Sequence, residues 1–134
     1  MLGNATVIYK TVHQKAIALS STEAEFYALS EAGKLSLYLR SILAQLDVPQ
    51  NHATVLYEDN QGCLFMTASG KPTKRTRHVD IRHFAILDWV EQDVLQIKKI
   101  GTSDNTADCL TKPTGRSLFY RHTDTMLGRR APVK

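Results

Sequence analysis

The chain is organised around the stretch Thr54–Gly62, in which an apolar strand ends on an acid and a helix begins at once. The Val-Leu-Tyr run at positions 55–57 combines β-branched, apolar and aromatic side chains, which favours a strand buried on both faces. A carboxylate such as Asp59 at the end of a buried strand lies at the rim of a sheet, where ligands gather in open α/β folds. The alternative is that Asp59 or Asn60 only caps the helix that begins near Gln61.

Length and composition indicate a single globular domain. A chain of 134 residues can build one core but not two, and 43% hydrophobic with 22% charged residues is ordinary for a soluble protein. No apolar run approaches the roughly 20 residues of a membrane helix, and no signal-peptide pattern opens the sequence. We therefore expect an intracellular protein with no membrane partner. Cys63 and Cys109 are isolated, which argues against a zinc site or a disulfide framework.

Positive charge is concentrated in two stretches. Residues 71–83 contain five basic residues and one acid, residues 112–134 contain six and one, and the rest of the chain contains six basic and eleven acidic residues. Lys and Arg that neutralise phosphates release counterions, so this segregation favours a polyphosphate partner. The alternative is a solvated loop and a solvated tail. The candidate nucleic-acid contacts of the first stretch are Lys71, Lys74, Arg75, Arg77 and Arg82.

The hydrophobic pattern predicts alternating strands and helices. We expect a strand at 6–9 that continues or resumes at 16–19, a helix over 20–46, a strand at 54–58, helices over 61–68 and 81–92, a strand at 94–100, a turn at 101–104, and helices over 106–110 and 117–127. Ser20 with Glu23, or Thr22 with Glu25, fits a capping box at the start of the long helix. Its predicted apolar stripe consists of Ala24, Tyr27, Ala28, Leu35, Leu39, Ile42, Leu43 and Leu46.

Three acids lie where an α/β enzyme would gather carboxylates. Asp59 ends a strand, Glu25 lies in the first turns of the long helix, and Asp108 lies in the first turn of the helix after the last strand. Mg²⁺ takes oxygen ligands, and in a two-metal site such ions activate water and stabilise the leaving oxygen of a phosphodiester. The spacing leaves alternatives open: Glu25 would only complete a capping box, and Asp108 would only favour its helix dipole.

Four short motifs occur in order along the chain. They are LSSTEAEFYAL at 19–29, YEDNQ at 57–61, RTRHVDIR at 75–82 and ADCLTKP at 107–113. Together they resemble the consecutive motifs of the ribonuclease H domain of copia-type LTR retrotransposon polyproteins. The resemblance covers about residues 1–113, a partial ribonuclease H-like domain, and leaves 114–134 as a basic C-terminal helix or tail. It implies an α/β, ribonuclease H-like mixed sheet flanked by helices, and hydrolysis of the RNA strand of RNA–DNA hybrids.

Carried over position by position, the resemblance assigns Glu25, Asp59 and Asp108 as catalytic, metal-binding acids, and Glu23 does not match. The implied cofactor is Mg²⁺, with Mn²⁺ as the alternative ion. The implied partners are an RNA–DNA hybrid, flanked by the basic loop at 71–82, and the reverse transcriptase domain of the same polyprotein. The implied location is the cytoplasm, in a virus-like particle, or the nucleus.

The family's pattern also has an earlier segment, a first strand with a fourth acid and then a second strand. We do not find it in this sequence, so we expect a fold that lacks the first strand and most of the second, with very low activity in isolation. The strand at 54–58 would then leave backbone groups unpaired, to be completed by a partner's strand, by self-association or by rearrangement of residues 6–19. The alternative function is a catalytically inactive retroelement fragment that at most binds nucleic acid.

The smaller signals leave several roles open. His78 and His83 would contact phosphate or assist product release, or would be ordinary loop and helix-surface residues. Trp89 and Tyr120 would stack on bases, or would pack in the core or at its edge. No residue is assigned as a general base.

Overall fold

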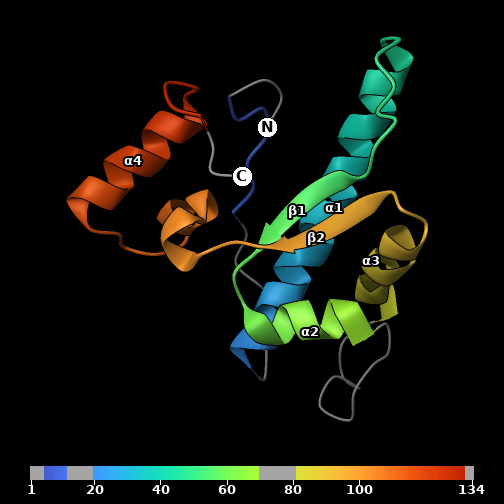
Figure 1. Ribbon diagram of the computed structural model, residues 1–134, viewed down its shortest axis with the longest axis horizontal. Coiled ribbons are helices and arrows are strands. Elements are labelled where there is room, and N and C mark those ends of the chain that lie inside the picture. The colour runs from blue at the N-terminus through green and yellow to red at the C-terminus, as the bar shows by residue number, and fades with distance from the viewer. Residues whose placement is uncertain (1–4, 12–19, 70–80, 132–134) are drawn as a thin grey trace. The chain divides into compact units, whose positions relative to one another are not determined.

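The computed structural model describes residues 5–11, 20–69 and 81–131, with only the backbone at 81–83. Its elements, in chain order, are α1 (Ser21–Gln45), β1 (Thr54–Glu58), α2 (Gln61–Ser69), α3 (Ile81–Glu91), β2 (Leu95–Lys99), the 3₁₀ helices η2 (Thr102–Asp104) and η3 (Thr106–Leu110), and α4 (Arg116–Met126) (Figure 1). The expected α/β pattern is confirmed from position 20 onward, with the ends of the predicted helices and strands correct to within one residue. None of the helices in these ranges is long and apolar enough to cross a membrane.

The chain divides into two compact units, which we describe separately. The sheet unit is Ala16–Lys99, and the terminal unit combines Met1–Lys15 with Ile100–Lys134. The division follows contacts in space, whereas the domain boundary expected after Pro113 follows a sequence resemblance. That boundary therefore stays a prediction.

Helix α1 begins where the capping pattern predicts. Ser20 has an extended backbone, and its Oγ accepts a hydrogen bond from the Glu23 amide at 3.2 Å. Near its other end, Arg40 holds the segment that leads into β1. Its guanidinium donates to the carbonyl oxygens of Gln50 at 2.7 Å and His52 at 2.8 Å, and to Thr54 Oγ1 at 3.0 Å. These bonds tie the start of β1 to α1.

Strands β1 and β2 lie side by side in parallel, and α2 and α3 stand in the connection between them (Figure 1). The register runs from Thr54 opposite Leu95 to Glu58 opposite Lys99. Among the described residues the sheet has these two strands, so β1 is not buried on both faces as predicted. Tyr57 is 41% exposed, and only Glu58 of the strand is fully buried. Strand β2 has one exposed side, with Leu95 buried and Gln96 and Lys98 exposed.

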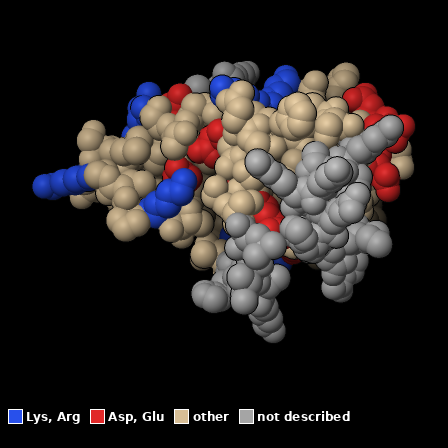
Figure 2. Space-filling model, turned by 90° about the horizontal axis from the view of Figure 1, so that it is seen from below, with Lys and Arg blue, Asp and Glu red and all other residues tan. Residues whose placement is uncertain are grey.

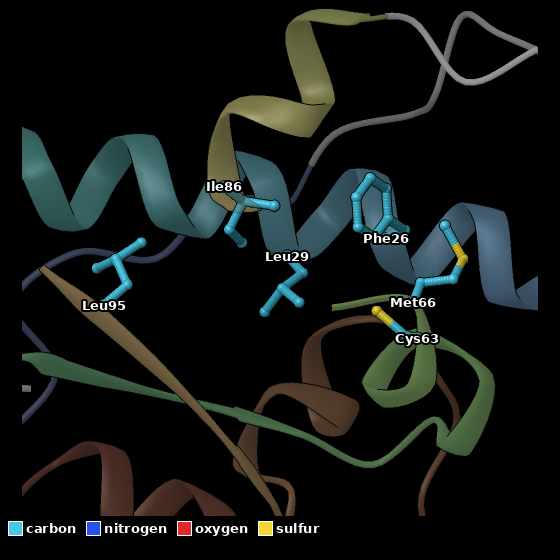
Figure 3. Close-up of a cluster of buried hydrophobic side chains, with 6 residues drawn as sticks. All are labelled: Phe26, Leu29, Cys63, Met66, Ile86 and Leu95. Atoms are coloured by element: carbon cyan, nitrogen blue, oxygen red, sulfur yellow. The ribbon is translucent and has the colours of Figure 1, made fainter. Parts of the chain in front are cut away.

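The core of the sheet unit packs the two connecting helices, α2 and α3, against α1. Its buried apolar residues are Phe26 and Leu29 of α1, Cys63 and Met66 of α2, Ile86 of α3 and Leu95 of β2 (Figure 3). The predicted apolar stripe of α1 is wrong in this region, since Ala28 is exposed and Phe26, Leu29, Ser30 and Gly33 are buried. A Cβ on Gly33 would lie 3.1 Å from Trp89 Cζ3. Gly33 therefore lets α1 approach α3 closely, and the packing role of Trp89 is confirmed.

The terminal unit is built around α4. The Thr6 amide donates to the Met126 carbonyl oxygen at 2.9 Å, Arg121 pairs with Asp104 of η2, and α4 packs on η3. The predicted strand at 6–9 is wrong, because residues 6–11 form no strand and Val7, Ile8 and Tyr9 are 50%, 40% and 73% exposed. These side chains favour a strand only where a neighbouring strand pairs with them. Its expected continuation at 16–19 lies outside the described residues.

Candidate active site

Two of the three predicted acids come together in the sheet unit. Glu25 lies in the second turn of α1 and Asp59 directly follows β1, and both side chains are half-buried. Both carboxylates act on Glu58, which is buried at the end of the strand. Burial is the main cause that raises the pKa of Glu58, and the negative charges of Glu25 and Asp59 raise it further. The two predicted ligands therefore lie within electrostatic reach of one buried carboxyl group.

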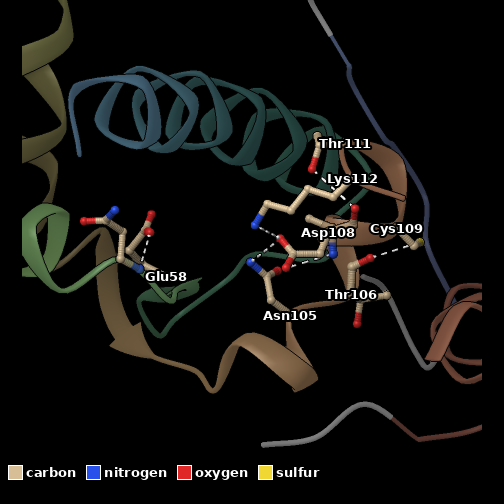
Figure 4. Close-up of polar contacts among 9 residues, drawn as sticks. Glu58, Asn105, Thr106, Asp108, Cys109, Thr111 and Lys112 are labelled. Carbon is tan, nitrogen blue, oxygen red and sulfur yellow. Dashed lines mark hydrogen bonds and ion pairs between the residues drawn. The ribbon is translucent and has the colours of Figure 1, made fainter. Parts of the chain in front are cut away.

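Glu58 was not among the predicted site residues. Its Oε1 accepts a hydrogen bond from the Asn60 amide at 2.8 Å, which fixes the turn that presents Asp59 (Figure 4). On its other side lies the Cys63 thiol, whose pKa is raised by burial and by the charge and hydrogen bond of Glu58. A charged residue at the end of an apolar strand was the available signal, but the sequence did not show that this side chain turns inward.

The turn after β1 is locked to the start of α1. Asn60 Oδ1 accepts from the Cys63 amide at 3.0 Å, so Asn60 is the residue that caps α2. The same oxygen accepts from Thr22 Oγ1 at 3.3 Å. A Cβ on Gly62 would lie only 2.6 Å from Thr22 Oγ1. The capping alternative is thus true of Asn60, and the contact with Thr22 holds the first turns of α1, which carry Glu25, close to the turn that carries Asp59.

The third predicted acid, Asp108, belongs to the terminal unit. It is buried in η3, and its Oδ1 accepts from Lys112 Nζ at 3.0 Å and from Asn105 Nδ2 at 3.5 Å (Figure 4). Asn105 caps η3 through a bond from the Ala107 amide at 3.3 Å. Asp108 therefore has a local role as the partner of Lys112, and its membership of one site with Glu25 and Asp59 stays a prediction.

A buried histidine of α4 lies in the electrostatic field of Asp108. His122 is 2% exposed, and its Nε2 has no hydrogen-bond partner among the described residues. Burial, and then the charge of Arg121, lower the pKa of His122, whereas Asp108 and Asp104 act in the opposite direction. His122 was not among the predicted site residues, although its spacing of four from Leu118 places both on one side of a helix.

Known proteins resemble most of this chain. It is 38% identical over 106 residues, or 79% of its length, to the Retrovirus-related Pol polyprotein from transposon TNT 1-94 of Nicotiana tabacum. It is 30% identical over 118 residues (88% of the chain) to the Pol polyprotein from transposon RE2, and 28% over 131 residues (98%) to that from transposon RE1, both of Arabidopsis thaliana. The chain is homologous to a segment of plant-transposon Pol polyproteins. It spans 8% to 9% of the length of these relatives.

No family model and no solved structure matches this Pol-related segment. The comparisons therefore support a retrotransposon polyprotein as the relative, and they do not specify which activity of a polyprotein the segment carries. The resemblance of the four motifs to retrotransposon polyproteins is therefore supported, and their resemblance to the ribonuclease H domain stays a prediction.

The residues of the sheet unit that could hold a metal ion are Glu25 and Asp59. In the ranges that the structure describes, no three His, Cys, Asp or Glu side chains are grouped closely enough to hold one. Two carboxylates nevertheless fit Mg²⁺, because this ion keeps several waters and commonly binds proteins through one or two carboxylates together with substrate phosphates. The negative charges of Glu25 and Asp59 are lesser causes, after burial, of the raised pKa of Glu58, and a cation would offset their contribution.

Most of the predicted phosphate-contacting residues of this Pol-related segment lie outside the described residues. Lys71, Lys74, Arg75 and Arg77 lie outside the described residues, as does the side chain of Arg82. The same holds for the side chains of His78 and His83. Their roles therefore stay predictions.

Proposed function

We propose that the chain is a ribonuclease H-like domain of a copia-type retrotransposon reverse transcriptase, which hydrolyses the RNA strand of RNA–DNA hybrids with Mg²⁺. The observation that carries the proposal is that Glu25 and Asp59 lie within electrostatic reach of the buried Glu58 carboxyl group, beside the turn that the bond between Thr22 and Asn60 holds against α1. The homology to Pol polyproteins supports the retrotransposon context. The parallel β1–β2 pair, joined through two helices, supports a ribonuclease H-like sheet.

Each residue has a proposed part. Glu25, Asp59 and Asp108 would hold Mg²⁺, or Mn²⁺ in its place. The bound ion supplies positive charge that activates water and stabilises the leaving oxygen of a phosphodiester. Asn60 positions Asp59 through its bond to Thr22, and the basic residues at 71–82 would hold the phosphates of the hybrid.

Cleavage of a hybrid labelled in its RNA strand tests this proposal. The full chain with Mg²⁺ should release RNA fragments slowly, because its activity in isolation is expected to be very low, and Asp59→Asn or Glu25→Gln should abolish the release. Asp93→Asn is the matched control, because Asp93 is exposed in the same unit and has a positive φ of 55° that asparagine tolerates. Calorimetric titration with Mn²⁺ gives a second readout that needs no turnover. Equal Mn²⁺ binding by the wild type, Asp59→Asn and Glu25→Gln would contradict the metal site.

The second candidate is a nucleic-acid-binding segment without catalysis. It is favoured by the lack of a three-ligand group among the described residues and by the two basic stretches. This candidate predicts retention of the hybrid without cleavage, with an affinity that falls as salt rises. Cleavage that is lost in Asp59→Asn would exclude it.

The partners follow from the proposed function. They are the reverse transcriptase domain of the same polyprotein and, at β1, a strand from that domain or from a second copy. Among the described residues, β1 pairs along one edge with β2, and a strand edge is a template for further pairing. The proposed location is a cytoplasmic virus-like particle or the nucleus. Co-purification with the reverse transcriptase domain, compared with the chain alone in gel filtration, tests the partner.

A further inference from the structure

Helix α4 exposes two adjacent aromatic side chains. Phe119 is 44% exposed and Tyr120 is 54% exposed, whereas His122 and Thr125 are the buried residues of the helix. Leu118, His122 and Thr125 follow the spacing of one helical face, so the aromatic pair lies on another. Tyr120 therefore does not pack in a core, and more than half of its surface is exposed; its packing at an edge stays a prediction.

The two rings and a cation form one surface, which we call the α4 aromatic face and define as Arg116, Phe119 and Tyr120. The ring centroids of Phe119 and Tyr120 are 6.1 Å apart with an interplanar angle of 70°. Arg116 Cζ lies 5.7 Å from the Tyr120 ring centroid, within the range of a cation–π contact. The guanidinium is thus held beside a flat, exposed ring.

The charges around the α4 aromatic face favour an anionic ligand. Residues 112–134 contain six basic residues and one acid. Arg121 pairs with Asp104, and Arg129 pairs with Asp124 at 3.7 Å. Among the described residues Arg116 makes no ion pair, so its charge is free for a ligand. Figure 2 shows both Lys and Arg (blue) and Asp and Glu (red) side chains on one face of the molecule.

Exposed rings beside cations match one class of ligand. Bases stack on aromatic side chains regardless of their sequence, and Arg contributes both cation–π contacts and charge for the phosphates. A paired duplex keeps its bases stacked on each other, so only unpaired bases can use such a ring. We propose that the α4 aromatic face binds single-stranded nucleic acid, RNA or DNA.

Filter binding with labelled single strands of about ten nucleotides tests this contact, since known sites of this type span roughly 4–16 nucleotides. The full chain is used with EDTA present, so that no cleavage occurs, and with RNA and DNA strands of one sequence. Tyr120→Ala should weaken binding roughly 5- to 100-fold, the usual loss for one stacked base. Tyr120→Phe keeps the ring and should bind like the wild type. Comparing the two strands shows whether RNA or DNA is preferred.

The charge contribution is separated from stacking by a second pair of variants. Arg116→Gln should weaken binding and reduce the salt dependence by about one counterion. Arg130→Gln is the matched control for net charge, because Arg130 is exposed and lies outside the α4 aromatic face. Circular dichroism of each free variant establishes that it is folded.

Three results would overturn the proposal. The first is single-strand binding by Tyr120→Ala equal to that of the wild type. The second is a loss of affinity in Tyr120→Phe as large as that in Tyr120→Ala. The third is loss of concentration-dependent self-association in Tyr120→Ala instead, which would make the face a contact between copies. None of these results depends on cleavage. Asp59→Asn should retain single-strand binding, so the failure of one proposal is distinguishable from the failure of the other.

Discussion

The contact between the first turns of α1 and α2 is most sensitive to substitution at Gly62. A Cβ there would lie 2.6 Å from Thr22 Oγ1, 2.8 Å from Thr22 Cγ2 and 3.2 Å from Asn60 Oδ1. The first two distances are shorter than any relaxed contact, so Gly62→Ala must push the first turns of the two helices apart. This movement would break the bond between Thr22 and Asn60 and separate Glu25 from Asp59.

The expected size of the effect combines two opposing contributions. Inserting a methyl group into a packed contact costs typically about 1–3 kcal/mol, and replacing glycine by alanine in a helix gains up to about 1 kcal/mol. Gly62→Ala should therefore lower the free energy of unfolding by about 1–2 kcal/mol. Thr22→Ala removes both clashing atoms and leaves Asn60 Oδ1 at 3.2 Å as the nearest of the three contacts. In that background Gly62→Ala should be neutral or stabilising.

Urea unfolding of the full chain, followed by circular dichroism, measures the four members of this double-mutant cycle. The coupling free energy between the two positions should be about 1–3 kcal/mol. Thr22→Ser keeps the hydroxyl group and removes Cγ2, so it serves as an intermediate background. The proposed contact between Thr22 and the start of α2 would be refuted if Gly62→Ala lowered the free energy of unfolding equally in the wild type and in Thr22→Ala. It would also be refuted if Gly62→Ala alone stabilised the chain.

Three further predictions concern other parts of the molecule. Arg40→Ala should lower the free energy of unfolding by about 1–3 kcal/mol, because it removes three charge-assisted hydrogen bonds to the segment before β1; Arg40→Lys, which lacks the fork, should rescue little of this loss in urea unfolding. The folded-state pKa of His122 is lowered from its ordinary value of 6.5, so its contribution to stability should be complete above that pH and fall as the pH drops toward the lower value. When the chain is titrated with acid in the presence of EDTA, His122→Gln should make the free energy of unfolding depend less steeply on pH. An unchanged slope would contradict the lowered pKa of His122. In native protein a thiol reagent should modify the partly exposed Cys109 first and Cys63 only on unfolding, since Cys63 is 0% exposed and burial raises its pKa. Native modification of both at equal rates, measured by mass spectrometry, would show that the core around Cys63 opens.

The helix boundaries were predictable because their signals are local. The Ser20 side chain caps the helix by accepting from the Glu23 amide three residues away, and the adjacent Asp59 and Asn60 indicate the turn after β1. The buried face of α1 was not predictable in the same way. Its close contact with α3 involves Gly33, which lies against Trp89, and small residues such as Gly33 and Ser30 carry no hydrophobic signal even when they are buried.

The candidate site was predictable in its residues but not in its support. The types and positions of Glu25 and Asp59 marked them as candidates, and the structure brings both within reach of Glu58. The bond that holds them together joins residues 38 positions apart, Thr22 and Asn60, and no sequence spacing indicates it. The strand expected at 6–9 failed for the related reason that strand pairing depends on distant partners.

The close approach of Trp89 to Gly33 offers a probe that distinguishes the two units. Trp89 is the single tryptophan of the sequence, and its ring packs within the sheet unit. Its fluorescence will therefore report the unfolding of Ala16–Lys99 alone, while the circular dichroism signal also includes α4. A denaturation midpoint that is the same for both signals means that the two units melt as one cooperative structure. Two different midpoints mean that each unit unfolds independently. The tryptophan fluorescence then gives the stability of the sheet unit, which carries Glu25 and Asp59.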